Sequence, residues 1–367
     1  MQISTLLDKI LDMAKDRRLY RFANADGKVW LMPAVNMRTA MNLYQPSGKN
    51  GKLLKKLFPI LHRLPIVRKA LRAETIECDL NAELRKILEN LFECEGIQFS
   101  IFCGTPCVHQ KITMQISIGS KILGYCKITE SSEIAQLFDR EAKTLNKLHE
   151  SGMTGIPQCL FQGEWKNGVY LFVQSTVKSN SSRVLHRWCK RHEDFLGQLH
   201  AVSAVSVKFE ESDYYQTLCQ LKEHIDWLPC QEAHVSVLKA IESVMNTYSG
   251  KQCEFMAYHA DFTPWNMFYE RGELFVFDWE YAQLSYPTML DRYHFFTQTA
   301  IFEKHWSVDD IQNYMSSQEG CWIDAEKYRF YLLDIISRFT IREKGNIEGD
   351  MNKSFAIWFD LLDYLQK

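Results

Sequence analysis

Two short stretches, "HADFTPWN" (His259–Asn266) and "FDWEYA" (Phe277–Ala282), concentrate polar side chains that could do chemistry. Asp261 and Asn266 are separated by a proline, which would disrupt a helix interior, so their spacing indicates a loop. Asp278 ends the apolar run "ELFVFD", which follows a turn at "ERGE" and predicts a hairpin. Because a hairpin brings its two ends together, we expect Asn266 and Asp278 to be neighbours.

An amide oxygen beside a carboxylate is the hard-oxygen environment that Mg²⁺ prefers. Asn266 and Asp278 are therefore candidate metal ligands, and Asp261 stays available as a proton acceptor. The alternative is a set of ordinary polar turn residues. Two aspartates beside aromatic residues are costly to bury without partners, so we interpret the cluster as a functional site.

A second pair of charged residues precedes this cluster. Lys127 lies in "GYCKIT", near the end of an apolar strand, where a lysine is unusual unless its ammonium leaves the sheet or meets an anion. Glu141, on the helix that follows, could supply that carboxylate. The alternative is a lysine that reaches solvent at a sheet edge and a solvated glutamate.

The elements that would position these residues follow from hydrophobic periodicity. Three runs rich in β-branched and aromatic residues predict strands from residue 98 to residue 129. A helix over residues 132–152 follows, and Asn167-Gly168 predicts a hairpin turn between two more strands. After Asn180 the helical period dominates, including residues 182–204, and helices resume from about Leu290. A small antiparallel sheet with one helix, followed by a larger helical region, predicts two lobes.

The N-terminal region differs in charge from the rest. Residues 1–73 hold 15 Lys+Arg against 4 Asp and no Glu, a net charge of +11 in a chain whose total is −2. Lys49–Arg72 contains eight cations and no acid, with Leu53, Leu54, Leu57, Leu61 and Leu64 spaced for one helical face and with Pro59 and Pro65 expected to break the helix. One interpretation, which we favour, is a helix docked on the acidic body. The other is contact with an anionic membrane or a phosphorylated glycolipid.

The composition indicates the location of the protein and excludes some kinds of partner. The 11 cysteines are scattered without a CxxC pair or a second ligand pair at metal-site spacing, which favours a reducing, intracellular compartment. The N-terminus lacks a signal-peptide pattern, and no apolar run approaches ~18 residues, so a cytoplasmic location is expected. Between residues 49 and 72 the only aromatic ring of Phe, Tyr or Trp type is Phe58, which argues against nucleic acid as a partner.

The quoted motifs resemble a known family. "HADFTPWN" fits the kinase H-x-D-x-x-x-x-N loop, and especially the H-x-D-x-x-P-x-N form of the aminoglycoside phosphotransferase and choline kinase group. "FDWEYA" is similar to the metal-binding D-x-E segment of that group. The resemblance covers about residues 98–291 and implies an α+β, bilobal protein-kinase-like fold. Its parts would be a basic segment (1–75, partly helical), an antiparallel-sheet N-lobe (76–176) and a helical C-lobe (177–367) with the catalytic loop and substrate site.

The resemblance also implies roles in phosphoryl transfer from ATP or GTP with Mg²⁺. Lys127 would hold the α- and β-phosphates with Glu141 orienting it. Asp261 would accept the proton of the attacking hydroxyl, and Asn266 with Asp278 would bind the metal. The acceptor would be a small molecule or a glycan.

Further residues receive accessory roles from the same resemblance. His259 would hydrogen-bond the backbone near Asp278, and Glu280 would be a further metal or substrate contact. The backbone of Gln174, Ser175 and Thr176 would meet the adenine at the interlobe hinge.

Two departures from the kinase pattern matter. The phosphate loop "CGTPCVHQK" keeps one glycine, Gly104, followed by Thr105, which leaves an inactive nucleotide-binding scaffold as the alternative function. There is also no room for a long activation segment after Asp278, which argues against a protein kinase. A contact of residues 49–72 with the inner face of the membrane would make the protein peripheral to it.

Overall fold

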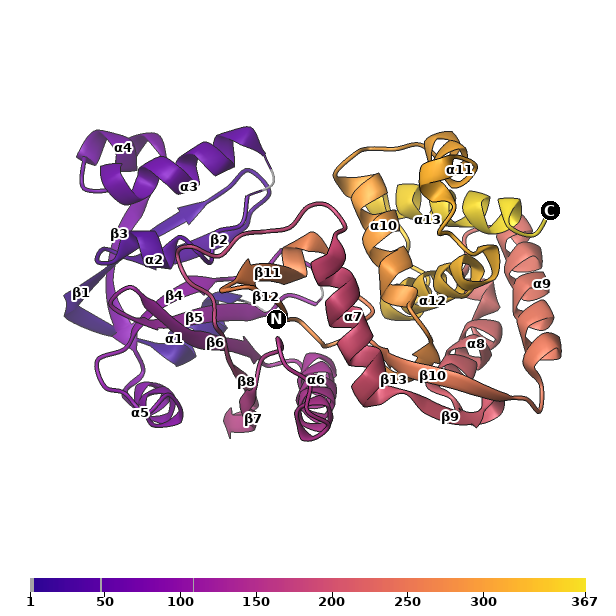
Figure 1. Ribbon diagram of the computed structural model, residues 1–367. Helices are drawn as coiled ribbons and strands as arrows, with labels where there is room; N and C mark the ends of the chain where they lie inside the picture. The colour runs from indigo at the N-terminus through magenta and orange to yellow at the C-terminus, as the bar shows by residue number, and fades with distance from the viewer. Residues whose placement is uncertain (1–2, 47, 108) are drawn as a thin grey trace. The chain divides into compact units, whose positions relative to one another are not determined.

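The computed structural model describes residues 3–46, 48–107 and 109–367, which form two compact units (Figure 1). Unit 1 comprises Met1–His149, Gly155–Arg183 and Phe268–Phe275. Unit 2 comprises Glu150–Thr154, Val184–Met267 and Val276–Lys367.

Unit 1 is built on an antiparallel sheet of eight strands in the order β3-β1-β2-β4-β5-β6-β8-β7. Five helices longer than one turn and one short helix accompany the strands along this part of the chain. The bounds are α1 Ile3–Ile10, β1 Leu11–Ala23, β2 Val29–Pro33, α2 Met37–Ala40, α3 Lys49–Leu61, α4 Pro65–Ala70, β3 Glu74–Leu80, α5 Ala82–Leu91, β4 Gln98–Phe102, β5 Ile112–Ile118, β6 Lys121–Thr129, α6 Ser132–Glu150, β7 Cys159–Lys166 and β8 Val169–Ser175.

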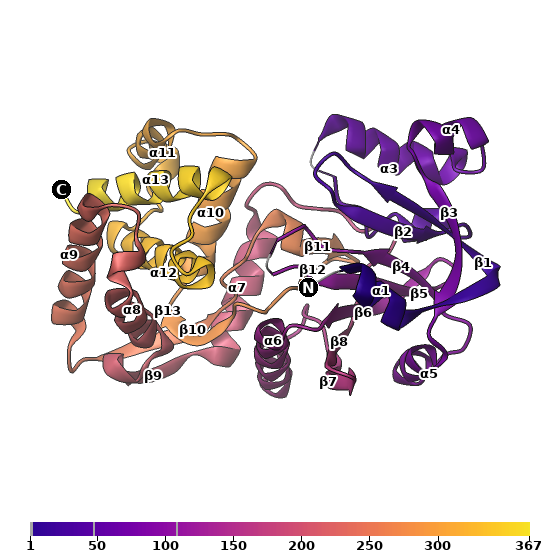
Figure 2. The same cartoon turned by 180° about the vertical axis from the view of Figure 1, so that it is seen from behind.

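The alternation of side chains along β1 and β2 supplies two separate apolar layers, because successive residues of a strand point to opposite faces. Tyr20 and Trp30 belong to the layer that also holds Phe58 of α3. Leu19 and Leu31 belong to the layer that α1 and α5 cover, and Figure 2 shows α1 lying over the strands in the view from behind. The sheet is thus buried on both faces at its N-terminal end.

The basic segment contributes more than the helix expected from its sequence. Strands β1 and β2 were not anticipated, and they extend the sheet beyond β4. Pro59 lies inside the last turn of α3, so it does not break the helix as expected, whereas Pro65 occupies the first turn of α4, where a missing N–H has no intrahelical partner to lose. The leucines do not all pack on one side of the helix as expected. The packed face of α3 is centred on Phe58, and it includes Leu54 but leaves Leu53 and Leu57 exposed.

Unit 2 is mainly helical, with a three-stranded sheet in the order β13-β10-β9. Its core is a cluster of aromatic and aliphatic side chains from the helices and from β10. The bounds are α7 Lys190–Ser203, β9 Val205–Lys208, α8 Asp213–Glu223, α9 Gln231–Tyr248, β10 Gln252–Tyr258, β13 Gln283–Pro287, α10 Leu290–Phe302, α11 Val308–Met315, α12 Ala325–Glu343 and α13 Gly349–Tyr364. The hairpin of β11 (Met267–Glu270) and β12 (Glu273–Val276) begins and ends in this unit, and its tip belongs to unit 1.

The α+β fold class is confirmed, with the strands β4 to β8, the helix α6 and the helical region in the expected order. Residues 182–189 are not helical as expected. Arg183 instead forms a bridge to Tyr269 of β11. No helix among the described residues is long and apolar enough to cross a membrane, and all eleven cysteines are free.

Candidate active site

Lys127 and Glu141 form an ion pair inside unit 1. Strand β6, which carries Lys127, lies between β5 and β8, so the lysine is not at a sheet edge. Its side chain is buried, as is that of Glu141 on α6, and Nζ lies 2.6 Å from Oε2 of the glutamate. The alternative in which Lys127 reaches solvent at a sheet edge is therefore excluded. A buried ammonium of this kind is positioned by its carboxylate partner.

In unit 2, the loop after β10 is held by His259. Its Nε2 donates to the carbonyl of Phe277, at 3.0 Å, and its Nδ1 accepts from the backbone N–H of Asp261, at 3.1 Å. These two bonds specify the neutral tautomer with the proton on Nε2. Burial lowers the pKa of His259 to about 4, so the ring stays neutral near pH 7. His259 thus fixes the backbone on both sides of the site.

The carboxylate of Asp261 is held at both oxygens. The Nδ2 of Asn266 donates to Oδ2 at 2.7 Å and to the Asp261 carbonyl at 3.0 Å. The Nε2 of His294 lies 3.2 Å from Oδ1. Burial is the largest single influence on Asp261 and opposes its ionisation, but the hydrogen bond from His294 and the electrostatic interactions with His294 and His259 together outweigh it and lower the pKa of the carboxyl below its usual range. Asp261 is therefore an oriented, ionised acceptor and not the isolated one expected from the sequence.

His294 and Asp291, which both lie on α10, were not predicted from the sequence. The two oxygens of Asp291 accept from the backbone N–H groups of His259, at 2.9 Å, and Ala260, at 3.1 Å. Ala260 has φ of 68°, in the left-handed region, so these bonds hold a strained backbone in place. A signal was present in "DRYHFF", since an aspartate and a histidine three residues apart on an otherwise apolar helix need polar partners.

Arg338 of α12 also supports the loop. Its guanidinium donates to the Ala260 carbonyl and forms an ion pair with Asp334, at 2.8 Å. Asp334 in turn accepts from the hydroxyl of Tyr258, at 3.0 Å. A buried network of this size, with partners on both charged groups, rigidifies the backbone that carries Asp261.

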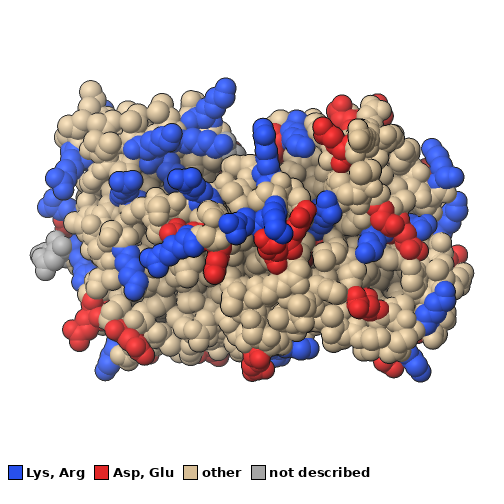
Figure 3. Space-filling model, in the orientation of Figure 1, with Lys and Arg blue, Asp and Glu red and all other residues tan. Residues whose placement is uncertain are grey.

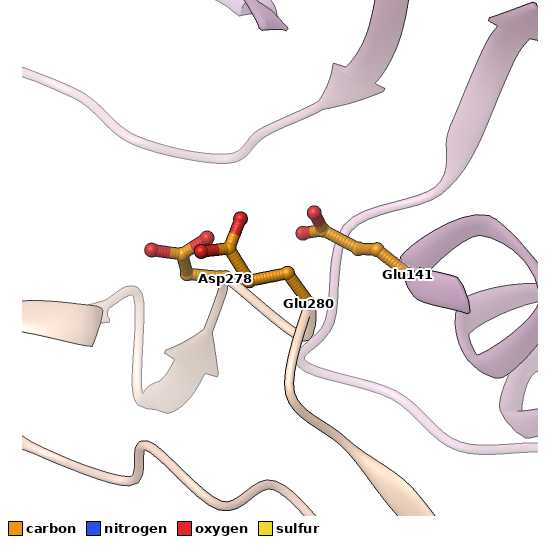
Figure 4. Close-up of side chains that lie close together, drawn as sticks. All are labelled: Glu141, Asp278 and Glu280. Atoms are coloured by element: carbon orange, nitrogen blue, oxygen red, sulfur yellow. The ribbon is translucent and has the colours of Figure 1, made fainter. Parts of the chain in front are cut away.

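Asp278 and Glu280 follow strand β12. The backbone N–H of Phe277 donates to the carbonyl of Asn266 at 3.0 Å, so the two ends of the hairpin meet as the sequence predicted. A carboxylate oxygen of Asp278 and one of Glu280 lie within 4.8 Å of each other. Figure 4 shows these two carboxylates side by side, and it also draws Glu141, which extends from α6. Asp278 has φ of 71°, a conformation that aspartate and asparagine tolerate better than most residues.

The residues expected at the nucleotide belong to unit 1. Gly104, with φ of 78°, lies in the connection from β4 to β5, and a Cβ there would come within 2.4 Å of the Lys111 carbonyl. The shape of this loop therefore requires glycine, and Thr105 beside it is exposed. Val108 in the same loop lies outside the described residues.

The hinge residues lie at the end of β8. The amide oxygen of Gln174 is buried and has no hydrogen-bond partner among the described residues. Ser175 accepts from the backbone N–H of Gln158, at 2.9 Å, and Thr176 from that of Lys178, at 3.2 Å. Their hydroxyls are thus used to hold the chain as it leaves the sheet.

Comparison with known proteins relates this geometry to a family. Residues 125–289 match the family described as "Phosphotransferase enzyme family", and no curated protein matches the chain by sequence. A solved structure of a thermostable mutant of aminoglycoside phosphotransferase APH(4)-Ia, in a ternary complex with ADP and hygromycin B, is 13% identical with a TM-score of 0.51. The match covers 77% of this chain and 98% of that one. A second mutant of that enzyme, with AMP-PNP and hygromycin B, is 12% identical with a TM-score of 0.51 over 78% and 98% of the two chains.

Choline kinase LicA from Streptococcus pneumoniae is 14% identical with a TM-score of 0.49, over 77% of this chain and 100% of that one. At these identities the solved structures show the fold alone. The matched segment contains Lys127, Glu141 and both quoted motifs, which confirms the resemblance given by the sequence. Residues 125–289 thus match the phosphotransferase enzyme family, and the solved structures show that the chain has the protein-kinase-like fold.

Proposed function

We propose that this protein transfers the γ-phosphate of ATP to a hydroxyl group of a small-molecule or saccharide-type acceptor, with Asp261 as the proton acceptor. The observation that carries the proposal is the state of Asp261. Asn266 and His294 orient its two oxygens, and the pKa of the carboxyl lies below its usual range. A carboxylate that is ionised and fixed in direction can orient an attacking hydroxyl and take its proton.

Asn266, Asp278 and Glu280 fit a divalent cation of the Mg²⁺ type. Two carboxylates with oxygens within 4.8 Å of each other form a hard-oxygen donor set. The amide nitrogen of Asn266 is engaged with Asp261, so the amide oxygen is the ligand atom that remains for a metal. When bound, the ion would neutralise charge on the phosphates. We propose Asn266 and Asp278 as its ligands and Glu280 as an accessory contact.

Lys127 and the end of β8 are proposed to hold the nucleotide. An ammonium held by Glu141 in a central strand suits contact with phosphate oxygens. The Oε1 of Gln174, which is buried and has no partner in the described part of the chain, supports a ligand at the hinge, and the backbone of Gln174, Ser175 and Thr176 is proposed to meet the base. We propose ATP and not GTP as the donor, because the two solved structures of aminoglycoside phosphotransferase APH(4)-Ia hold ADP and AMP-PNP. Gly104 and Thr105 are proposed to cover the phosphates.

A pocket of about 330 Å³ in unit 2 supports a polyhydroxylated acceptor. Trp188, at its wall, contacts the ring of Phe262, the residue after Asp261, with ring centroids 6.3 Å apart. The lining also holds two carboxylates and two cations, so it is balanced in charge and does not favour a simple cation. Aromatic faces beside paired polar groups suit a sugar ring. The lining residues are Trp188, Glu193, Leu196, Met289, Arg292, Tyr293, Trp322, Asp324 and Lys327.

The test is a phosphate-transfer screen over sugars, amino alcohols and nucleosides with ATP and GTP as donors. We expect at least one acceptor to be phosphorylated and Asp261→Asn to lower turnover by roughly 10²–10⁴-fold while Mg·ATP binding is retained. Turnover that survives in Asp261→Asn would remove Asp261 from its role. Nucleotide binding without transfer to any acceptor would favour the alternative, an inactive nucleotide-binding scaffold.

We also propose a cytoplasmic location. Its support is the set of eleven free cysteines, four of which lie in the apolar layer of unit 1 that α1 and α5 cover, where a thiol acts as a small apolar side chain.

A further inference from the structure

Helices α3 and α4 leave large apolar side chains in solvent. Of the fifteen exposed large hydrophobic residues in the described chain, five lie between residues 53 and 66. A concentration of this kind in so short a segment is unusual for a surface without a partner. The exposed fractions are 56% for Leu53, 42% for Leu57, 74% for Ile60, 48% for Leu64 and 77% for Ile66.

The exposed side chains form a second apolar face, distinct from the one that packs on the sheet. Phe58 is buried against Tyr20 and Phe22 and anchors α3 to unit 1. Leu53, Leu57 and Ile60 recur at steps of four and three and therefore share one face of α3. The packing of Phe58 thus fixes the helix with an apolar face directed outward.

Cations surround this second face. Lys49–Arg72 contains eight Lys+Arg and no acid, and Figure 3 shows Lys and Arg side chains gathered over the region of α3 and α4. Six of the eight are exposed, and none of these six forms an ion pair with any residue that the structure describes. Those six are Lys49, Lys52, Lys56, Arg63, Lys69 and Arg72.

Two contrasts show that this charge is not used to hold the fold. The arginines of β1 are paired with the neighbouring strand, as in Arg18–Glu77 and Arg21–Glu74. Arg68, which is half-buried, donates to the carbonyls of His62 and Arg63, at 2.8 Å each, and so ties α4 to the end of α3. The exposed cations of α3 and α4 have no comparable structural task.

We propose that α3 and α4 form a surface that docks on an anionic lipid membrane, with the apolar face at the acyl boundary and the cations on the headgroups. An exposed apolar face bordered by unpaired Lys and Arg has the two attractions that interfacial helices use. Nucleic acid would require exposed rings for stacking, and Phe58 is buried. A two-fold symmetric dimer through this surface would bring two surfaces of like charge together. This proposal is independent of the phosphotransfer mechanism.

Co-sedimentation of the full chain with vesicles tests the surface. We compare phosphatidylcholine vesicles with vesicles that contain 30% phosphatidylglycerol, in about 0.1 M salt. Lys52→Gln, Lys56→Gln and Lys69→Gln together should weaken binding to the anionic vesicles by on the order of a hundredfold, and Leu53→Ser, Ile60→Ser and Ile66→Ser together by a similar factor.

Matched controls separate the surface from net charge and general hydrophobicity. The variant Lys86→Gln, Lys121→Gln, Lys239→Gln makes the same change in net charge on exposed lysines elsewhere and should bind as the parent does. Val184→Ser with Val235→Ser removes exposed apolar side chains elsewhere and should also have no effect. Circular dichroism of each variant checks that it is folded.

Three results would overturn the proposal. The first is that the parent binds neither type of vesicle, or binds both equally. The second is an equal loss of binding in the control variants. The third is that the parent binds a single-stranded oligonucleotide, or forms a dimer by light scattering, in a way that the surface variants abolish while vesicle binding is absent.

Discussion

The Nε2 atom of His294 lies 3.2 Å from Oδ1 of Asp261, within one unit and 33 residues away along the chain. Burial lowers the pKa of His294, so near pH 7 the ring is neutral and Nε2–H is the donor. The Nδ1 atom has no hydrogen-bond partner among the described residues. His294 can therefore carry its proton on Nδ1 if Asp261 is replaced by asparagine, so that Nε2 can accept a hydrogen bond from the new amide.

Replacement of His294 should change the pH dependence of turnover. His294→Phe removes the hydrogen bond that lowers the pKa of Asp261 and leaves the burial that raises it. We expect the acidic limb of the kcat/KM profile to move to higher pH, with a loss of about tenfold at the acidic end for each pKa unit. His305→Asn, on an exposed histidine, is the control. An unchanged acidic limb would show that His294 only fills space.

The pair Lys127–Glu141 should behave as a coupled unit in unfolding. Because both side chains are buried, Lys127→Met alone or Glu141→Gln alone should lower the free energy of unfolding in urea by roughly 3–5 kcal/mol. The double variant should lose less free energy of unfolding than the sum of the two single losses. Like each single variant, it should fail to bind nucleotide. Additive losses would mean that the two side chains do not depend on each other for stability.

Asp278 should control the response to metal. Its φ of 71° makes alanine a strained replacement, so Asp278→Asn is the cleaner test of the carboxylate. We expect Mg·ATP to raise the melting temperature of the parent more than ATP with a chelator does, and Asp278→Asn to lose that difference. Asp278→Ala should lose it too but should also be less stable by about 1 kcal/mol without ligand. A metal response that is unchanged in Asp278→Asn would remove Asp278 from the site.

Stability should fall as the pH is lowered from about 6.5 towards 4. Burial lowers the pKa of His192 and of His259 to about 4, whereas histidine in an unfolded chain titrates near ~6.5. In that window the unfolded state binds more protons, so each histidine lowers the free energy of unfolding by up to about 1.4 kcal/mol per pH unit. Burial raises the pKa of Asp291 to about 7, which contributes a slope of the opposite sign.

A comparison of variants isolates the histidine contribution from that of Asp291. His192→Phe keeps a ring against Trp188, which the imidazole stacks on at 5.1 Å, and should reduce the slope by about one proton. His305→Asn should leave the slope unchanged. Urea titrations at pH 7.5, 6 and 5 measure the effect, and equal slopes in His192→Phe and the parent would contradict it.

Turn residues that are close together in the chain explain why the hairpins could be predicted from the sequence. Asn167 has φ of 50° and Gly168 φ of 73°, the conformation that a tight hairpin turn requires, and the strands on either side were expected for that reason. The hairpin that brings Asn266 to Phe277 followed from its turn in the same way. Residues near one another in the chain thus predicted most of the sheet and the loop of the site.

What the sequence did not reveal depends on distant partners. Strand β1 has the sequence "LDMAKDRRLYRFA", whose charges obscure the alternation of a strand, and its arginines are balanced by glutamates of β3 more than fifty residues later. Asp291 and His294 likewise form hydrogen bonds with backbone and side-chain groups of the loop about thirty residues earlier. Only the folded chain brings those groups together.

The addition of β1 and β2 to the sheet has a consequence for self-association. Without them β4 would be an edge strand, with the backbone of Ile101 and Phe102 open to pairing with another chain. The outer edge is instead β3, which bears the exposed charges of Glu74 and Glu77, a feature that discourages edge-to-edge aggregation. A chain that began after residue 80 would uncover β4, so the basic segment protects the solubility of the sheet as well as extending it.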